Sequence, residues 1–125
     1  MKAIMVIAAL MLCDFTFQET KWEVPSDAQK IVNPLIGDGK NIQSGKETFN
    51  KICWSCHGSE GKGDGPAASN LRKKPADFTS AEFKKQTEGS IYYKISEGRD
   101  EMASYKNLLS SKQRWQLVLF LQTLK

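Results

Sequence analysis

The stretch Cys53-Trp54-Ser55-Cys56-His57 decides how this chain of 125 residues folds. Two thiols separated by two residues, and followed at once by an imidazole, suit one task well. The thiols add to the two vinyl groups of a haem, and the adjacent histidine then lies under the iron and binds it through a ring nitrogen. The pentad therefore predicts one covalently attached haem c, held by Cys53 and Cys56, with His57 as an axial ligand.

Other uses of a CxxC pair fit the rest of the sequence less well. A thioredoxin-type dithiol needs a strand–helix–strand context, whereas this chain shows helical patterns and loops. A zinc site needs a fourth ligand. Because His57 is the only histidine, that ligand would have to be an Asp, a Glu or the remaining cysteine, Cys13. Three cysteines, an odd number, also do not fit a disulfide framework.

A second axial ligand is predicted by elimination among the four methionines. Three of them lie within the first 13 residues, which leaves Met102, in a loop after Gly98-Arg99-Asp100-Glu101. Thioether ligation favours reduced iron and raises the reduction potential. The alternatives to Met102 are a lysine side chain, Tyr105, water or an open position.

The N-terminal residues predict an exported protein. A short basic start, Met1-Lys2, precedes an apolar run from Ala3 to Leu12. The run is too short to span a bilayer as a helix but suits the apolar part of a signal peptide. We therefore expect residues 1–13 to be a signal peptide or lipoprotein leader. The protein would then be periplasmic or on the outer side of the cytoplasmic membrane.

The end of this leader allows two kinds of processing. Leu10-Met11-Leu12-Cys13 is similar to a lipoprotein box, although the residue before that cysteine is normally small and here it is Leu12. A lipidated Cys13 would tether a soluble domain to the membrane. Ordinary cleavage further downstream would instead remove the odd thiol.

Beyond the leader, the chain divides into an arm and one helical domain. Residues 14–40 are mixed in polarity and contain two prolines, so they are expected to form an extended arm or tether. The domain, residues 41–125, shows helical patterns at 41–52, near 80–86, at about 87–97 and from Ser110 onward. Gly45 lies on the apolar face of the first helix and predicts a close helix crossing there.

The charge pattern favours protein partners. The formal charge is +4 and the sequence pI is about 9.0, but the lysines are scattered, so we expect no nucleic-acid binding. A weak positive field would steer redox protein partners with acidic docking surfaces. Five basic side chains either flank such a docking face or are ordinary solvated surface: Arg72, Lys73, Lys74, Lys84 and Lys85.

With these residues, the chain resembles the class I (mitochondrial-type) cytochrome c family, in its small bacterial mono-haem form. The resemblance covers about residues 42–124. Besides the pentad, it is carried by Gly45 and Phe49, Gly63-Asp64-Gly65-Pro66, Lys74-Pro75-Ala76-Asp77-Phe78, Ile91-Tyr92-Tyr93-Lys94-Ile95-Ser96-Glu97-Gly98, Met102 and the helix with Trp115. It implies an all-α fold of about four to five helices wrapped round one covalently bound haem.

The resemblance also implies roles for single residues. His57 and Met102 would be the axial ligands of the iron. Pro66, which matches the family's proline on the histidine side, would offer its backbone carbonyl to the N–H of His57. Ala103 departs from the family, which often has proline directly after the methionine ligand.

These features predict a mono-haem c-type cytochrome that carries single electrons between redox proteins outside the cytoplasm. No nucleophile–base pair or catalytic carboxylate pair is evident, so the chain is not expected to be an enzyme. One alternative is a haem subunit of a larger dehydrogenase, reductase or oxidase complex, which the arm at residues 14–40 would suit. Another is a haem-based ligand sensor, which requires Met102 to be absent from the iron or easily displaced.

Overall fold

The computed structural model describes residues 21–125, and the regular elements in that range are helices. They are α1 (Ser26–Gln29), α2 (Gly39–Ile52), α3 (Trp54–His57), the 3-10 turn η1 (Ala68–Asn70), α4 (Ala81–Lys84), α5 (Glu88–Glu97) and α6 (Ser111–Thr123). The expected all-α class is confirmed. Six α-helices exceed the expected four to five, because α1 and α3 are short turns of four residues each.

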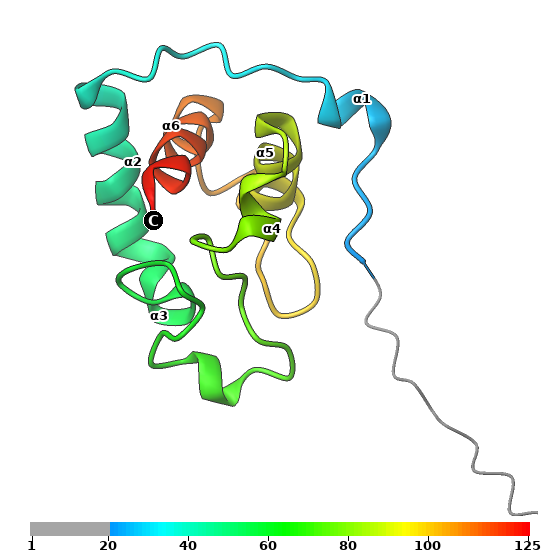
Figure 1. The fold of residues 1–125 in the computed structure, drawn as a ribbon, viewed down its shortest axis with the longest axis vertical. Helices are drawn as coiled ribbons and strands as arrows, with labels where there is room; N and C mark the ends of the chain where they lie inside the picture. The colour runs from blue at the N-terminus through cyan, green and yellow to red at the C-terminus, as the bar shows by residue number, and fades with distance from the viewer. Residues whose placement is uncertain (1–20) are drawn as a thin grey trace, which may run out of the picture.

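Helices α2 and α6 lie side by side and form the framework of the domain (Figure 1). They cross at Gly45, where a Cβ atom would lie 2.1 Å from the Gln116 carbonyl oxygen and 2.9 Å from the Phe120 Cβ. Only glycine permits this approach, so the predicted crossing is confirmed. One turn later on α2, Phe49 is fully buried and continues the same face into the core.

Helix α6 begins and ends with specific capping contacts. The Ser110 hydroxyl accepts from the Gln113 backbone N–H, and the Gln113 side chain accepts from the Ser110 N–H, which forms the capping box expected from their spacing. At the other end, the Lys84 ammonium donates to the carbonyl oxygens of Gln122 and Leu124. Lys84 therefore caps α6, a role that the sequence did not reveal.

The remaining segments bring the candidate ligands to the framework. The chain after α3 makes a long loop through η1 to α4 and forms the lower end of the molecule in Figure 1. Helix α5 begins after its N-cap Thr87 and ends at Gly98, close to the predicted bounds. Residues 98–110 then connect α5 to α6 and contain Met102; we call this segment the Met102 loop.

The described part of the N-terminal arm is extended but lies against the domain. It passes over the upper end of the molecule before entering α2 (Figure 1). Helix α1 packs on α5 at Gly89, where a Cβ would lie 2.0 Å from the Ala28 carbonyl oxygen. Asn33 donates from its backbone to Glu88 and from its side chain to the Trp115 carbonyl, at 3.1 Å in both cases.

The leader predicted at residues 1–13, including Cys13, lies outside the described residues. Among residues 21–125, no helix has the length and apolar character needed to cross a bilayer.

Candidate haem site

The pentad forms a tight turn directly after α2. Cys53 ends α2 and precedes α3, and its carbonyl oxygen accepts from the N–H groups of Cys56 and His57, at 3.3 and 3.0 Å. The short helix thus holds two thiols and one imidazole within a single turn. Because this turn continues a helix that is locked into the core at Gly45, the position of His57 is fixed by the framework of the domain.

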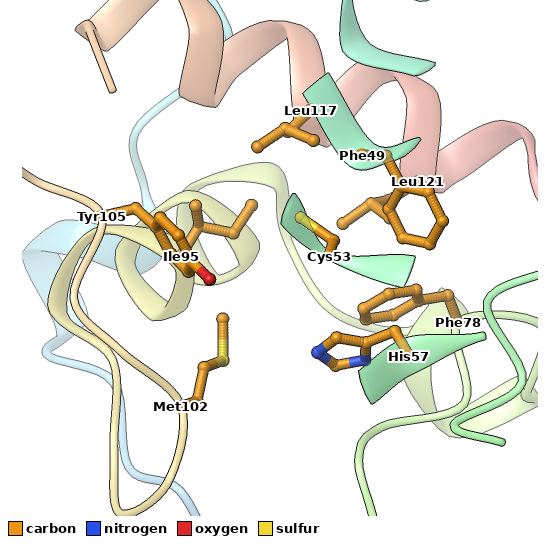
Figure 2. A pocket seen from close by; sticks show the side chains of 9 residues that line it. All are labelled: Phe49, Cys53, His57, Phe78, Ile95, Met102, Tyr105, Leu117 and Leu121. Carbon is orange, nitrogen blue, oxygen red and sulfur yellow. The ribbon is translucent and has the colours of Figure 1, made fainter. Parts of the chain in front are cut away.

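One apolar pocket collects the side chains that the sequence singled out. Its lining residues come from α2, α3, α5, α6 and two loops: Phe49, Cys53, His57, Phe78, Ile95, Met102, Tyr105, Leu117 and Leu121. Figure 2 shows the His57 ring and the Met102 side chain entering this space from different sides. The structure therefore brings the two predicted axial ligands together, although they are far apart in sequence.

Two contacts from one loop segment, residues 76–78, orient the His57 ring. Its Nδ1 lies 3.2 Å from the Ala76 carbonyl oxygen, and its ring stacks on Phe78 with a centroid distance of 4.5 Å and an interplanar angle of 21°. Burial lowers the pKa of His57, and the Ala76 carbonyl only partly opposes this effect. The imidazole is therefore neutral at physiological pH and offers Nε2 to a metal.

The prediction that Pro66 supplies the carbonyl for His57 is wrong, because Ala76 does so. The Gly65 N–H donates to the Cys56 carbonyl at 3.1 Å, and the Ala67 N–H donates to the Ser55 carbonyl at 2.8 Å. These bonds hold the exposed Pro66 beside the backbone of the pentad. The chain reaches the imidazole only ten residues later, where Phe78 N–H donates to the Gly61 carbonyl at 2.7 Å.

The Cys53 thiol lacks the electrostatics of a reactive redox cysteine. Burial, reinforced by Cys56, raises the pKa of the Cys53 thiol to about 12. A reactive dithiol needs the opposite shift, toward the thiolate. Residues 21–125 also contain no cluster of three His, Cys, Asp or Glu side chains that could complete a metal site. Of the uses weighed for this CxxC pair, covalent haem attachment therefore suits the described site.

Tyr105 lines the pocket and was an alternative ligand to Met102. Burial raises the pKa of its phenol, and the neighbouring Cys53 and Cys56 act in the same direction. A phenol that stays protonated is a poor donor to iron compared with a phenolate. A thioether has no proton to lose before it binds iron, so Met102 is the simpler second ligand on chemical grounds.

The Met102 loop is held by ionic contacts to the segment after η1. The Lys73 ammonium lies 3.0 Å from the Asp100 carboxylate. The Glu101 carboxylate accepts from the backbone N–H of Arg72 at 2.8 Å and lies 3.7 Å from its guanidinium group. Arg72 and Lys73, two of the five basic side chains considered for a docking face, thus hold the loop that carries Met102.

The residues present fit a haem c. The Cys53 thiol lines an apolar pocket, a neutral imidazole is oriented toward it, and a thioether faces it from another loop. Cys56 is not among the lining side chains but lies in the same short helix as His57, at the spacing from Cys53 that haem attachment requires. Cys53 and Cys56 would attach the group, and His57 and Met102 would be the axial donors. The aromatic and aliphatic lining would exclude water from the porphyrin. The sequence patterns had placed Phe49, Ile95, Leu117 and Leu121 on apolar helix faces, whereas no local signal marked the Ala76 carbonyl.

An all-α domain with this site is a c-type cytochrome with covalently bound haem c. The family model for cytochrome c matches residues 42–125, and the chain belongs to the cytochrome c family. The comparison with curated proteins gives no match.

Solved structures with a similar fold include chains of different lengths. In a Kuenenia stuttgartiensis reducing HAO-like protein complex, Kustc0457/Kustc0458, one chain is 31% identical with a TM-score of 0.65, and the match covers 88% of this chain but 53% of that one. The KustC0563 c-type cytochrome is 26% identical with a TM-score of 0.57, and the match covers 65% of this chain and 96% of that one. Cytochrome CL from Methylophaga aminisulfidivorans, 19% identical with a TM-score of 0.55, shares the fold over 69% of this chain and 56% of its own.

The extent of these matches differs at the N-terminal end. This chain spans about half of the length of the matching chain in the HAO-like complex. The family match to residues 42–125 is about two thirds of this chain. A match over 88% of this chain therefore extends into the arm that precedes residue 42.

Proposed function

We propose that this cytochrome carries single electrons between redox proteins outside the cytoplasm and has no catalytic activity of its own. One observation supports this proposal most strongly. His57 and Met102, which are far apart in sequence, face the same apolar pocket. Two protein ligands leave no position for a substrate at an iron between them. A site closed in this way suits electron transfer better than catalysis.

A haem c bound in this pocket supplies a one-electron redox couple at its iron. The residues of this chain contribute orientation, polarity and exclusion of water. The Ala76 carbonyl and the Phe78 ring fix His57, so the imidazole has little freedom to rearrange. The Met102 thioether favours the reduced state and sets a higher potential than a second nitrogen ligand would.

The basic surface next to the Met102 loop supports an acidic redox partner. Arg72 and Lys73 lie beside this loop, and their side chains are 84% and 41% exposed. Electron exchange with an acidic partner should slow as salt rises, because salt screens long-range attraction. Charge reversal at Arg72 should weaken that dependence. A rate that does not change with salt would contradict an acidic partner.

A permanent subunit of a larger complex is the second candidate. It is supported by the 31% identical chain, which is part of a complex and whose match extends into the arm before residue 42. Purification of the tagged full-length protein from its own host, in high salt, separates the two candidates. A stable partner at fixed ratio favours the subunit, and recovery of the cytochrome alone favours the shuttle.

Export completes the proposal and rests on the leader sequence, which would be processed either by lipidation of Cys13 or by ordinary cleavage further downstream. The mass of the mature N-terminus distinguishes a lipidated Cys13 from ordinary cleavage. Recovery of haem-free protein in the cytoplasm alone would overturn export.

The absorption spectrum of the oxidised and reduced holoprotein tests the iron ligation on which the proposed electron transfer rests. We expect the weak long-wavelength band that accompanies methionine ligation of ferric haem, and only slow binding when carbon monoxide is added to the reduced protein. Rapid carbon monoxide binding would instead favour the ligand sensor.

A further inference from the structure

The Met102 loop is a tight turn that leaves α5 at Gly98. Arg99 and Met102 exchange backbone hydrogen bonds of 3.0 Å in both directions, and between them Asp100 adopts a left-handed conformation with φ of 54°. Met102 is followed by Ala103, so no proline ring restricts the backbone after the methionine. After Met102, residues 104–106 donate hydrogen bonds to the carbonyl oxygens of Ile95 and Ser96, which tie this side of the loop to α5. On the other side of Met102, the position of the thioether depends on what holds residues 99–101.

One side of this turn is held by exposed charges. Lys73 pairs with Asp100, and Glu101 accepts from the Arg72 backbone. Exposed ion pairs stabilise little, because water and salt screen them. These contacts alone would leave the turn free to open often.

The other side of the turn meets an aromatic ring from the N-terminal arm. The guanidinium carbon of Arg99 lies 4.8 Å from the centroid of the Trp22 ring, which is partly buried. Lys94 approaches the same ring at 5.6 Å. Trp is the best partner for cation–π contacts, and arginine is a frequent donor. Trp22 thus contacts the residue whose backbone pairs with Met102.

The arm is anchored well enough to present Trp22 at this place. Helix α1 follows shortly after Trp22 and packs against Gly89 of α5, where no side chain would fit. Asn33 then joins the arm to both α5 and α6 through hydrogen bonds to Glu88 and to the Trp115 carbonyl. These contacts fix the arm on the same helix from which the Met102 loop departs.

We propose that Trp22 is a positioning residue for Met102, and that the arm, by holding Arg99, keeps the Met102 loop closed over the haem pocket. The inference rests on the proposed function, since it takes Met102 as the axial ligand. When the aromatic contact is lost, the loop opens more often and external ligands reach the iron. The N-terminal arm thereby controls the reactivity of a site formed entirely by later residues.

The test compares Trp22→Leu with Trp22→Phe in the full-length holoprotein. Leucine keeps apolar bulk without a π face, whereas phenylalanine keeps the face. Val32→Ala is the matched arm control, because Val32 is 76% exposed. We expect Trp22→Leu to raise the rate of carbon monoxide binding to the reduced protein about fivefold. The methionine-dependent band should weaken in Trp22→Leu, while the other two variants stay close to wild type.

Equal carbon monoxide rates in wild type and Trp22→Leu would overturn the inference, and so would an equal increase in Trp22→Phe. If Trp22→Leu gives no holoprotein, Arg99→Gln tests the contact from its other side. Arg99→Lys, which keeps the charge, is then the control, and an equal rate in Arg99→Gln and wild type would overturn the inference. A wild-type protein that lacks the methionine-dependent band would instead show that the proposed function itself fails.

Discussion

The two sides of the haem pocket are held by different kinds of contact. On one side, His57 lies one residue after Cys56 in a single helical turn, and its ring is stacked on Phe78 and bonded to the Ala76 carbonyl. On the other side, Met102 lies in a loop held by exposed ion pairs, by contact with the arm and by hydrogen bonds from residues 104–106 to the end of α5. The histidine is thus placed mainly by the local chain, and the methionine by tertiary contacts. When the fold is perturbed, we therefore expect the Met102 side of the pocket to open before the His57 side.

Removing the thiols has the largest expected effect. Cys53→Ser together with Cys56→Ser eliminates both thioether links, so no haem should remain on the chain after denaturation. Haem staining of a denaturing gel and the mass of the polypeptide measure this directly. Cys13→Ser is the matched control and should keep its haem. Covalent haem on the double variant would contradict the assigned attachment.

Met102→Ala tests the weaker side of the pocket and leaves the covalent links intact. We expect the methionine-dependent band to disappear, carbon monoxide to bind the reduced protein, and the reduction potential to fall, because the thioether favours reduced iron. Leu108→Ala, a change at a side chain that is 70% exposed before α6, should leave all three unchanged. If Met102→Ala keeps the band, another residue ligates the iron.

Gly45→Ala perturbs the helix crossing that supports both sides. A Cβ at this position would lie 2.1 Å from the Gln116 carbonyl oxygen, so the helices must move apart. We expect the free energy of unfolding to fall by about 3 kcal/mol. In Gly39→Ala the new Cβ meets nothing within 4 Å, and stability should change by less than about 1 kcal/mol. Equal stability in the two variants, measured by denaturant unfolding, would contradict the close crossing.

The smallest expected effect is on stability at acid pH, and it involves Asp77 in the segment that orients His57. Hydrogen bonds from the side chain and backbone of Thr79 lower the pKa of Asp77. A carboxyl group with a lowered pKa in the folded state contributes stability above its unfolded pKa, near 3.9, and loses it as pH falls further. Unfolding followed against pH should therefore show a slightly shallower acid decline in Asp77→Asn. An identical decline below about pH 4 would show that Asp77 contributes nothing.

The sequence predicts the histidine side far better than the methionine side. The haem-attachment motif consists of five consecutive residues, so it can be recognised from the sequence alone. The spacing of Ser110 and Gln113 predicts a helix cap that the structure confirms. Gly45 likewise predicts a crossing from its place on an apolar helix face. These features depend on residues that are close in sequence, so local patterns suffice.

What the sequence could not predict depends on the path of loops. The Ala76 carbonyl replaces that of Pro66 because the chain turns back toward His57 only at residues 75–78. Backbone carbonyls carry no side-chain signature, so nothing local distinguishes the two. The contact between Trp22 and Arg99 joins two segments that are far apart in sequence and requires the arm to lie on α5. Met102 is predicted by elimination and by its place in a loop, without a local motif as specific as the pentad.

The absorption spectrum of the purified wild-type holoprotein tests the central claim most directly, because it reports both iron ligands at once. We expect covalently bound haem, the methionine-dependent band in the oxidised state and only slow carbon monoxide binding in the reduced state. An oxidised spectrum without that band, together with rapid carbon monoxide binding, would contradict closure of the iron by His57 and Met102.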